Sequence, residues 1–399
     1  MALKKNQTLN FIDVFSGAGG FSAGLEMAGL KCILGIDFDK YATQTFARNH
    51  KHAEVYCGDV SKLSSAKLKT LLKGQQVDAV VGGPPCQGFS TVGLGNPEDQ
   101  RNSLFLQFIR LVKLTKPSFV VVENVTGLLA KKNEETLKAI FKKFDQLGYK
   151  MDVQVMSAQN YGVPEMRRRT ILIGTKLNAD VRFPDFTHTE KNWPTVGLAL
   201  KDLKSPSGDI FNHDLEAAVP KCQLDLARLK HVPEGRGIRY EKDEKELLPK
   251  SLQLKINWKE VRENRLRQAK YFRLDRKKPS PTIMTHRQSY YHPTENRYLT
   301  QREAARIQSF PNDFVFEGPV SAQWRQIGNA VPPLMGKSIG LALKAMLAES
   351  FKTKKKDLSK SKKKSTEGEN ILVFRKKAFV YREPNQGQKT PVSARSKIS

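Results

Sequence analysis

Short apolar runs alternate with longer amphipathic segments over about the first 180 residues, and this alternation restricts the fold more than any other feature. Each run has the length of a buried strand, and the segments between them repeat at helical spacing. Strands interleaved with helices predict a parallel sheet with helices on both faces. We expect strands over Asn10–Phe15, Cys32–Asp37, Val77–Gly82, Phe119–Glu123, Met151–Ser157 and Thr170–Gly174, and helices over Leu104–Leu114 and Glu134–Leu147.

The sequence becomes polar and rich in Pro, Gly and charge between Phe183 and about Thr282. We interpret this stretch as a second, smaller domain. Its arginines are interleaved with aromatic residues, which is typical of nucleic-acid contact, although an ordinary solvated surface explains each residue taken singly almost as well. Helices are expected again over Thr300–Ser309 and Pro332–Leu347.

The charge balance favours a polyanionic partner. Lys and Arg number 68 against 40 acidic residues, a formal net charge of +28. The segment Ser350–Ser399 has a net charge of +11, so the rest of the chain still carries +17. Each phosphate that a Lys or Arg neutralises releases condensed counterions, which favours binding. Composition alone does not separate DNA from RNA or from an anionic membrane surface.

Several other classes of protein are disfavoured. No apolar run approaches the roughly 18 residues of a membrane-spanning helix, and no secretory signal is visible, so we expect a cytoplasmic protein. The four cysteines are far apart, without a C-x-x-C pair, and the seven histidines form no H-E-x-x-H. We therefore expect reduced thiols and no metal site.

Closely spaced glycines follow the first predicted strand. The turn Gly17-Ala-Gly19-Gly20 precedes a helix, where glycine lets a ligand approach the backbone amides. The dinucleotide pattern G-x-G-x-x-G is incomplete because Ser22 occupies its last position, which disfavours a dehydrogenase. Asp37 and Asp59 follow the next two strands, where an acid can bind ribose hydroxyls or an adenine amino group. Together these strand ends predict an adenosine-containing cofactor.

The loop after Val77–Val81 reads Gly82-Gly-Pro-Pro-Cys86-Gln-Gly. Two prolines fix its path and remove amide donors, so we expect Cys86 to be presented at the same crevice. A free cysteine is more often a small buried apolar residue, and that interpretation suits Cys32 and Cys57. It does not suit Cys86, because a glycine-flanked Pro-Pro-Cys-Gln loop cannot form a core face.

Six further sequence blocks stand out along residues 10–345. They are Phe15-Ser-Gly17-Ala-Gly19-Gly20, Gly83-Pro-Pro-Cys86, Glu123-Asn124-Val125, Gln159–Arg169, Leu299–Pro311 and Gln326–Pro333. In this order they resemble the DNA cytosine-5-methyltransferase family of the restriction-modification type. Any one block could arise by chance, but six in the family order are highly specific. The resemblance implies a doubly wound, Rossmann-like α/β sheet that binds S-adenosylmethionine, with a smaller inserted DNA target-recognition domain.

The resemblance also implies roles for catalytic residues. Cys86, as a thiolate, would add to carbon 6 of cytosine, which makes carbon 5 nucleophilic enough to take a methyl group. Glu123, with a raised pKa, would protonate or hydrogen-bond ring nitrogen 3, and Asn124 would hold its neighbourhood. Arg167 and Arg169 match family arginines near the base carbonyl and the cysteine loop. The target base must leave the duplex stack to reach Cys86.

On the cofactor side, the resemblance implies that Phe15 stacks on adenine, Asp37 binds the ribose and Asp59 binds the adenine amino group. The family often has Glu at the position of Asp37. Leu104 and Asn329 would lie near the methionine part. The remaining expected cofactor contacts are Gly17, Gly19, Gly20, Val60, Pro84 and Val331.

The distant position of Asn329 implies a discontinuous catalytic domain of residues 1–182 and 321–349. Residues 183–320 would then form the inserted target-recognition domain, and residues 350–399 a basic, Lys-rich, partly disordered tail. The expected partner is double-stranded DNA, without metal or membrane, and the expected state is a monomer. The enzyme would be the modification half of a restriction-modification system or an orphan methylase, nucleoid-associated and prokaryotic.

Two alternatives stay open. A tRNA cytosine methyltransferase would share the same blocks, but the long segment 183–282 suits a reader of duplex DNA in the major groove. A DNA-binding regulator or decoy could keep the fold and lose activity. The presence of Cys86, Glu123 and Arg169 argues against the decoy.

Overall fold

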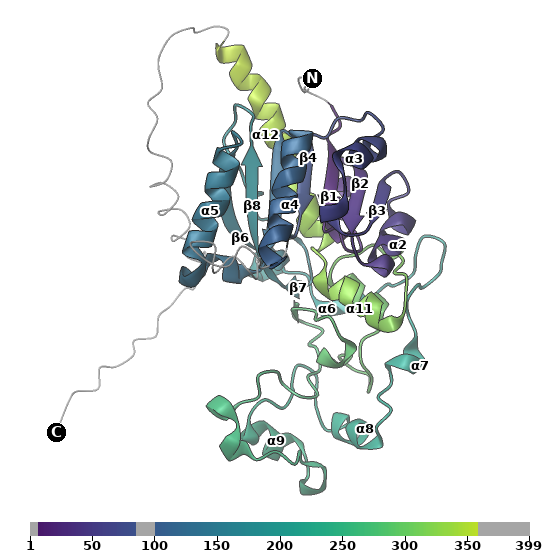
Figure 1. Ribbon diagram of the computed structural model, residues 1–399. Coiled ribbons are helices and arrows are strands. Elements are labelled where there is room, and N and C mark those ends of the chain that lie inside the picture. Colours follow the sequence, from purple (N-terminus) through teal and green to yellow (C-terminus); the bar gives the residue numbers. More distant parts are fainter. Residues whose placement is uncertain (1–6, 85–99, 358–399) are drawn as a thin grey trace, which may run out of the picture.

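The structure is a computed structural model that describes residues 7–84 and 100–357. In this part of the chain a seven-stranded sheet has the strand order β3-β2-β1-β4-β5-β8-β6 (Figure 1). The order reverses beside β1, so the segments that follow β1, β2 and β4 leave one edge around a shared crevice. The strands are β1 (Asn10–Val14), β2 (Lys31–Asp37), β3 (Glu54–Cys57), β4 (Ala79–Gly82), β5 (Phe119–Asn124), β6 (Lys150–Ser157) and β8 (Arg168–Thr175).

The expectation of a wholly parallel sheet is wrong at β8. Strands β1 to β5 pair in parallel, but β8 runs antiparallel to both β5 and β6. Only a 3-10 turn, η5 (Ala158–Tyr161), and the two-residue strand β7 (Glu165–Met166) lie between β6 and β8. A parallel pair needs a crossover of a dozen or more residues, usually helical, so this connection allows only a reversal.

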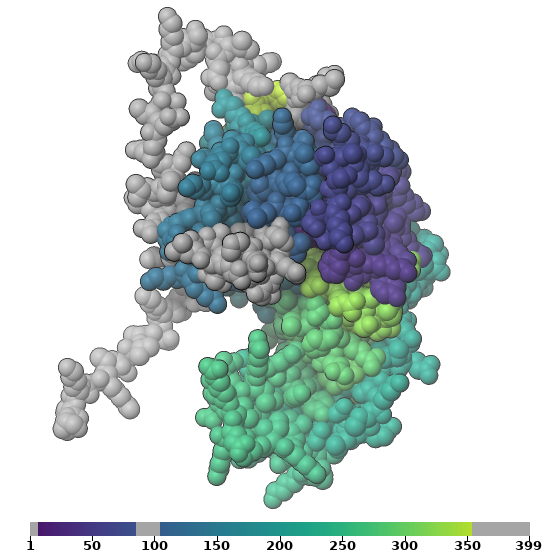
Figure 2. Space-filling view, in the orientation of Figure 1, coloured from purple at the N-terminus to yellow at the C-terminus, as the bar shows by residue number. Residues whose placement is uncertain are grey.

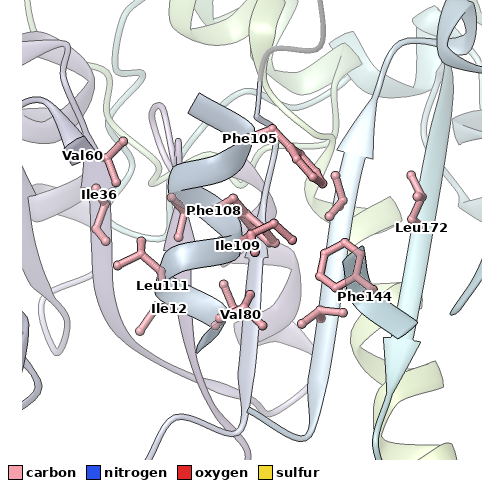
Figure 3. Packing of buried hydrophobic residues seen from close by; sticks show 14 of the residues in the cluster. Ile12, Ile36, Val60, Val80, Phe105, Phe108, Ile109, Leu111, Phe144 and Leu172 are labelled. Atoms are coloured by element: carbon pink, nitrogen blue, oxygen red, sulfur yellow. The ribbon is translucent and has the colours of Figure 1, made fainter. Parts of the chain in front are cut away.

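Helices cover both faces of the sheet. Neighbouring residues of a strand point to opposite sides, and because the strands are apolar at both sets of positions, both faces have to be buried. On one side, Phe108 of α4 belongs to one apolar cluster with Ile12, Val80 and Phe144, and Figure 3 shows these side chains gathered over the strands. On the other, Phe11 packs in a cluster with residues of α1, α2 and α12. The helices are α1 (Gly20–Met27), α2 (Lys40–Asn49), α3 (Ser65–Leu72), α4 (Gln100–Thr115), α5 (Glu134–Asp145) and α12 (Pro333–Asp357).

Helices α1 and α12 approach each other closely at glycines. A Cβ atom on Gly24 would lie 2.1 Å from the Pro333 carbonyl oxygen and 2.7 Å from the Gly336 Cα. Only glycine permits this spacing, so the chain after residue 332 returns to the first helix of the sheet. No helix among the described residues is long and apolar enough to cross a membrane.

A smaller lobe lies below the sheet in Figure 1, and it is a separate mass in the space-filling view of Figure 2. It consists mainly of short helices and turns, in which buried guanidinium groups bind the carbonyl oxygens that regular structure would otherwise pair. Arg273 donates to the carbonyls of Leu229, Val232, His292 and Glu295, and Arg302 donates to those of Phe211, Pro311 and Phe314. Elements here and at its border are α6 (Val196–Leu200), α7 (Leu215–Ala218), α8 (Gln223–Leu229), α9 (Glu241–Leu247), β9 (Ser280–Pro281), α10 (Gln301–Ile307) and α11 (Val320–Asn329).

A buried carboxyl group lies in the central strand. Asp13 of β1 is 1% exposed, and its Oδ2 accepts a hydrogen bond from Ser22 Oγ at 2.7 Å. Burial raises the pKa of Asp13 to about 7, the hydrogen bond from Ser22 opposes the rise, and the charge of Asp37 adds to it. The folded protein therefore holds a proton on Asp13 more tightly than the unfolded chain does.

We predict that Asp13→Asn changes the pH dependence of stability. Because the folded state raises the pKa of Asp13, protonated Asp13 increases the free energy of unfolding. This contribution is complete below the pKa that Asp13 has in the unfolded chain, and it is lost as pH rises through about 7. Asparagine keeps an acceptor for Ser22 without the charge. The free energy of unfolding of the variant relative to wild type should therefore rise by about 3 kcal/mol between pH 5 and pH 8. Urea unfolding at both pH values measures this, and a constant difference would contradict it.

Candidate active site

The carboxyl ends of β1 and β2 are tied together by the Asp37 side chain. Its Oδ2 accepts from the Gly17 amide at 2.8 Å and its Oδ1 from the Asp39 amide at 2.9 Å. Burial raises the pKa of Asp37 more than these two amide bonds lower it. The chain reverses sharply at Phe15, whose φ is 63°, and this brings the glycine turn over Asp37.

The three glycines of the turn serve different purposes. A Cβ atom on Gly17 would meet nothing within 4 Å, so this glycine borders open space. A Cβ atom on Gly19 would lie 2.2 Å from His50 Nε2, and one on Gly20 would lie 2.6 Å from the Val331 carbonyl oxygen. Gly17 therefore leaves room for a ligand, whereas Gly19 and Gly20 allow close packing against neighbouring segments.

Asp59 follows β3 beside the end of β2. Its Oδ1 accepts from the Ser61 amide at 2.8 Å, which lowers its pKa, and its side chain is exposed. Val60 is buried below it, and Leu104 packs against the same apolar cluster as Phe15. The expected adenosine contacts on β1, β2 and β3 therefore stand at adjacent strand ends.

The chain after α11 reaches the same edge. Asn329 is exposed at the carboxyl end of α11, and Val331 is 8% exposed beside the glycine turn. The predicted cofactor residues of both chain segments are thus brought together, although about 300 residues separate them.

Phe38 is a candidate that sequence reasoning missed. It follows Asp37 directly and is 78% exposed, the largest exposed fraction among the large apolar side chains of the described residues. An aromatic residue next to a strand-end acid is the signal that points to it, because a planar ring bound at Asp37 would lie within its reach. We expect Phe38 to cover one face of that ring.

Glu123 lies at the end of β5 and forms an ion pair with β8. Its Oε1 is 2.8 Å from Arg169 Nε, and the two side chains are 13% and 17% exposed. Burial raises the pKa of Glu123, and the charges of Arg169 and Arg167 oppose the rise. Its Oε2 faces Gly83, where a Cβ atom would approach within 3.0 Å. The carboxyl group is therefore held by one oxygen, and its other oxygen borders the start of the Cys86 loop.

Asn124 fixes the same loop from the next position. Its Nδ2 donates to the carbonyl oxygen of the buried Pro84 at 2.9 Å, and its Oδ1 accepts from the Val125 amide. Cys86 itself lies outside the described residues. Asn124, which holds the near end of its loop, and Glu123, which borders that end, belong to one strand end.

The three consecutive arginines differ in environment. Arg167 is fully buried, Arg168 is exposed, and Arg169 is half-buried at Glu123. Arg167 Nη2 donates to the Gly328 carbonyl oxygen at 3.0 Å, and burial lowers the pKa of Arg167. The side-chain alternation of a strand thus turns Arg167 and Arg169 inward and Arg168 outward. No group of three or more His, Cys, Asp or Glu suited to a metal lies within residues 7–84 or 100–357.

The family profile for C-5 cytosine-specific DNA methylases matches residues 9–345. The chain belongs to this family. Among its relatives, Type II methyltransferase M1.HphI of Haemophilus parahaemolyticus is 39% identical, with 85% of this chain and 87% of the relative covered. Type II methyltransferase M.DdeI of Desulfomicrobium norvegicum is 34% identical, with 83% and 87% covered.

A solved structure is also similar to this chain. A candidate DNA modification methyltransferase encoded within a prophage (E. coli) has a TM-score of 0.61 and 28% identity, with 85% of this chain and 99% of that chain covered. The expected family, fold class and reaction are confirmed, as is S-adenosylmethionine as the methyl donor. The methylase is a DNA cytosine-5-methyltransferase.

The strand ends of the methylase fit S-adenosylmethionine. Gly17 borders open space, and Asp37 is held beside it by two amides. Asp59 is exposed with a lowered pKa, so it carries a charge that can accept from an amino group. Gly17, Asp37 and Asp59 would hold the adenosine part, and Phe38 adds an aromatic surface beside them.

We predict that Phe38→Ala weakens the binding of S-adenosylmethionine about 2- to 12-fold, because an aromatic stacking contact contributes about 0.5–1.5 kcal/mol. Phe38→Trp should bind within about twofold of wild type, since it keeps a stacking ring. Leu114→Ala is the control. Leu114 is also an exposed apolar residue, but it lies at the end of α4 opposite to Leu104, the expected cofactor contact on that helix. Titration calorimetry with the cofactor measures all three, and an unchanged affinity of Phe38→Ala would refute the contact.

Proposed function

We propose that this methylase modifies cytosine within one short duplex sequence, as the modification enzyme of a type II restriction-modification system or as an orphan methylase. The names of its bacterial relatives support the type II assignment, and they support action in a prokaryotic cytoplasm at the nucleoid. The observation that carries the proposed chemistry is the Glu123 carboxyl, held by Arg169 at 2.8 Å and bordering Gly83 of the cysteine loop.

The proposed reaction begins with addition of the Cys86 thiolate to carbon 6 of the cytosine. Glu123 donates a proton to ring nitrogen 3, and the ring electrons then make carbon 5 nucleophilic. S-adenosylmethionine, when bound, supplies an electrophilic methyl group on sulfur. Carbon 5 would take that methyl group as the methyl–sulfur bond breaks, leaving the cofactor as a neutral thioether. A base would then remove the carbon-5 proton. The electrons of that bond would restore the ring double bond and expel Cys86, while the proton on ring nitrogen 3 returns to Glu123.

The environment of Glu123 suits this role. A general acid works best when its pKa lies near the working pH. Burial moves the pKa of Glu123 in that direction, while the ion pair with Arg169 keeps the carboxyl in one orientation. Asn124 holds Pro84, two residues before Cys86, so acid and nucleophile would be positioned by one strand end.

We assign residues 1–182 and 321–349 to the catalytic domain and residues 183–320 to target recognition, acting as a monomer. The basic tail assigned to residues 350–399 lies mostly outside the described residues. In the recognition domain, a hollow of about 500 Å³ is lined by Val261, Arg262, Glu263, Arg265, Leu266 and Arg267. Such a concentration of guanidinium groups supports contact with DNA phosphates.

We predict that bisulfite sequencing of plasmid DNA treated with this methylase and its cofactor reveals protected cytosines in one short motif. Cys86→Ser should give no protection, because it removes the nucleophile. Glu123→Gln should lower the methylation rate by about 100-fold or more while keeping cofactor affinity, because it removes the acid.

Other outcomes separate the alternatives. If Cys86→Ser protects cytosines as well as the wild-type enzyme does, the proposed mechanism is contradicted. If the wild-type protein protects no DNA, the same assay on tRNA tests the RNA alternative. Binding of duplex DNA with 5-fluorocytosine at the target, but without a covalent adduct, would support the decoy.

We predict that Arg262→Ala/Arg267→Ala weakens binding to all duplexes and lowers the slope of log affinity against log salt by about two, because each phosphate that is no longer neutralised reduces the slope by about 0.9. Both arginines are exposed. Lys67→Ala/Lys69→Ala removes equal charge from the exposed surface of α3 and is the control. Fluorescence anisotropy across a salt series is the measurement, and equal slopes for the two double variants would remove these arginines from the interface.

A further inference from the structure

The smaller lobe, which belongs to the proposed recognition domain of residues 183–320 and is called the recognition lobe below, returns to the sheet at β9. This point lies directly beside the segment that leads into β8. Strand β7 pairs in parallel with β9, Glu165 opposite Ser280 and Met166 opposite Pro281. Thr282 Oγ1 adds a hydrogen bond to the Met166 carbonyl oxygen at 3.0 Å. Arg167 and the start of β8, which carries Arg169, therefore follow directly from the point where the lobe is attached.

Glu165 connects these two parts from within. Its side chain has no exposed surface, and its Oε1 accepts from the Ile283 amide of the lobe at 2.6 Å. The same oxygen is 3.7 Å from Nη1 of the buried Arg167, whose Nη2 donates to the Gly328 carbonyl oxygen. A buried charge without its partner is strongly destabilising, so the positions of Glu165 and Arg167 depend on each other.

The contact also reaches the cofactor edge. Gly328 precedes Asn329 at the carboxyl end of α11. A Cβ atom on Gly328 would lie 2.6 Å from the Met284 carbonyl oxygen and from the Thr285 amide, so α11 and the lobe segment after Ile283 touch through backbone atoms. The lobe, α11 and the beginning of β8 thus meet around one buried ion pair.

We propose that Glu165 is a positioning residue that couples the recognition lobe to the Glu123–Arg169 pair, acting through Arg167. The inference rests on the proposed role of Glu123 as the acid. Arg167 and Arg169 lie on the same side of the chain two residues apart, so a shift of Arg167 displaces Arg169. Glu165 holds Arg167 against the Ile283 amide, and a movement of that amide on DNA binding is passed to the catalytic pair.

Charge gives the coupling a measurable signature. Glu123 faces the positive charges of Arg167 and Arg169, and Glu165 faces the same two arginines and the Tyr290 hydroxyl. Removing the negative charge of Glu165 leaves Glu123 in a more positive field, which favours its ionised form. Methylation needs protonated Glu123, so the decline of activity with rising pH should then occur at lower pH.

The experiment compares Glu165→Gln with wild type in single-turnover methylation of a cognate duplex between pH 5.5 and pH 9. Glutamine keeps an acceptor for the Ile283 amide and removes the charge. We expect a rate about 10- to 100-fold lower. We also expect the alkaline decline to shift by about one pH unit toward acid. Affinities for cofactor and DNA should stay within about twofold, because neither ligand is placed in contact with Glu165.

Glu244→Gln is the matched control. Glu244 is 4% exposed inside the lobe and accepts from Trp258 Nε1, away from both arginines. Its pH profile should coincide with that of wild type. Glu165→Asp, which keeps the charge, should have a reduced rate with the alkaline decline at the wild-type position.

The outcomes are separable. A wild-type rate and profile for Glu165→Gln would overturn the coupling, whereas a wild-type enzyme that methylates no DNA would instead overturn the proposed function. If Glu165→Gln does not fold, Glu165→Asp decides. A wild-type rate, or a decline shifted toward acid, would then overturn the proposal.

Discussion

The close crossing of α1 and α12 determines how the rest of the methylase is arranged. Gly24 and Gly336 let the two helices touch through backbone atoms. Helix α1 begins at the glycine turn, and α12 begins just after Val331. Fixing the helices against each other therefore places the two separated parts of the cofactor edge side by side. The lobe is enclosed between these parts, so its attachment also depends on the crossing.

Charge burial is the second recurring theme. The methylase buries Asp13 and Glu165 in and beside its sheet, and Arg273 and Arg302 in and beside its lobe. The lobe arginines replace the backbone pairing that irregular turns lack. Of the acidic groups, Asp13 holds a proton because burial disfavours its ionisation, whereas Glu165 keeps its charge beside the buried Arg167, next to the Glu123–Arg169 pair. Burial of charged groups therefore supports folding in the lobe, and beside the sheet it sets the charges around the proposed catalytic residues.

The sequence pattern predicted the sheet and the strand-end residues well, because buried strands read as apolar runs and their ends meet at one edge. It could not predict the direction of β8, which depends on the absence of a helix in a short connection. Nor could it resolve the lobe, since guanidinium–carbonyl contacts such as those of Arg273 leave no periodicity. Its assignment of Gly19 and Gly20 to the cofactor stays a prediction, to which the structure adds that both are also needed for packing against His50 and Val331. It was wrong about Cys57, which is exposed and not a buried apolar residue. Phe38 was missed because one aromatic residue forms no pattern.

The pairing of β7 with β9 has a consequence for how such enzymes diversify. It brings Glu165 and Ser280 into register, so the chain between them forms a closed loop of more than a hundred residues. The entropy lost on closing a loop grows only logarithmically, about 0.6 kcal/mol for each doubling of its length. This loop includes β8, but insertions and deletions after Thr175, where β8 ends, change its closure entropy little. New recognition surfaces can arise there while the catalytic machinery stays unchanged.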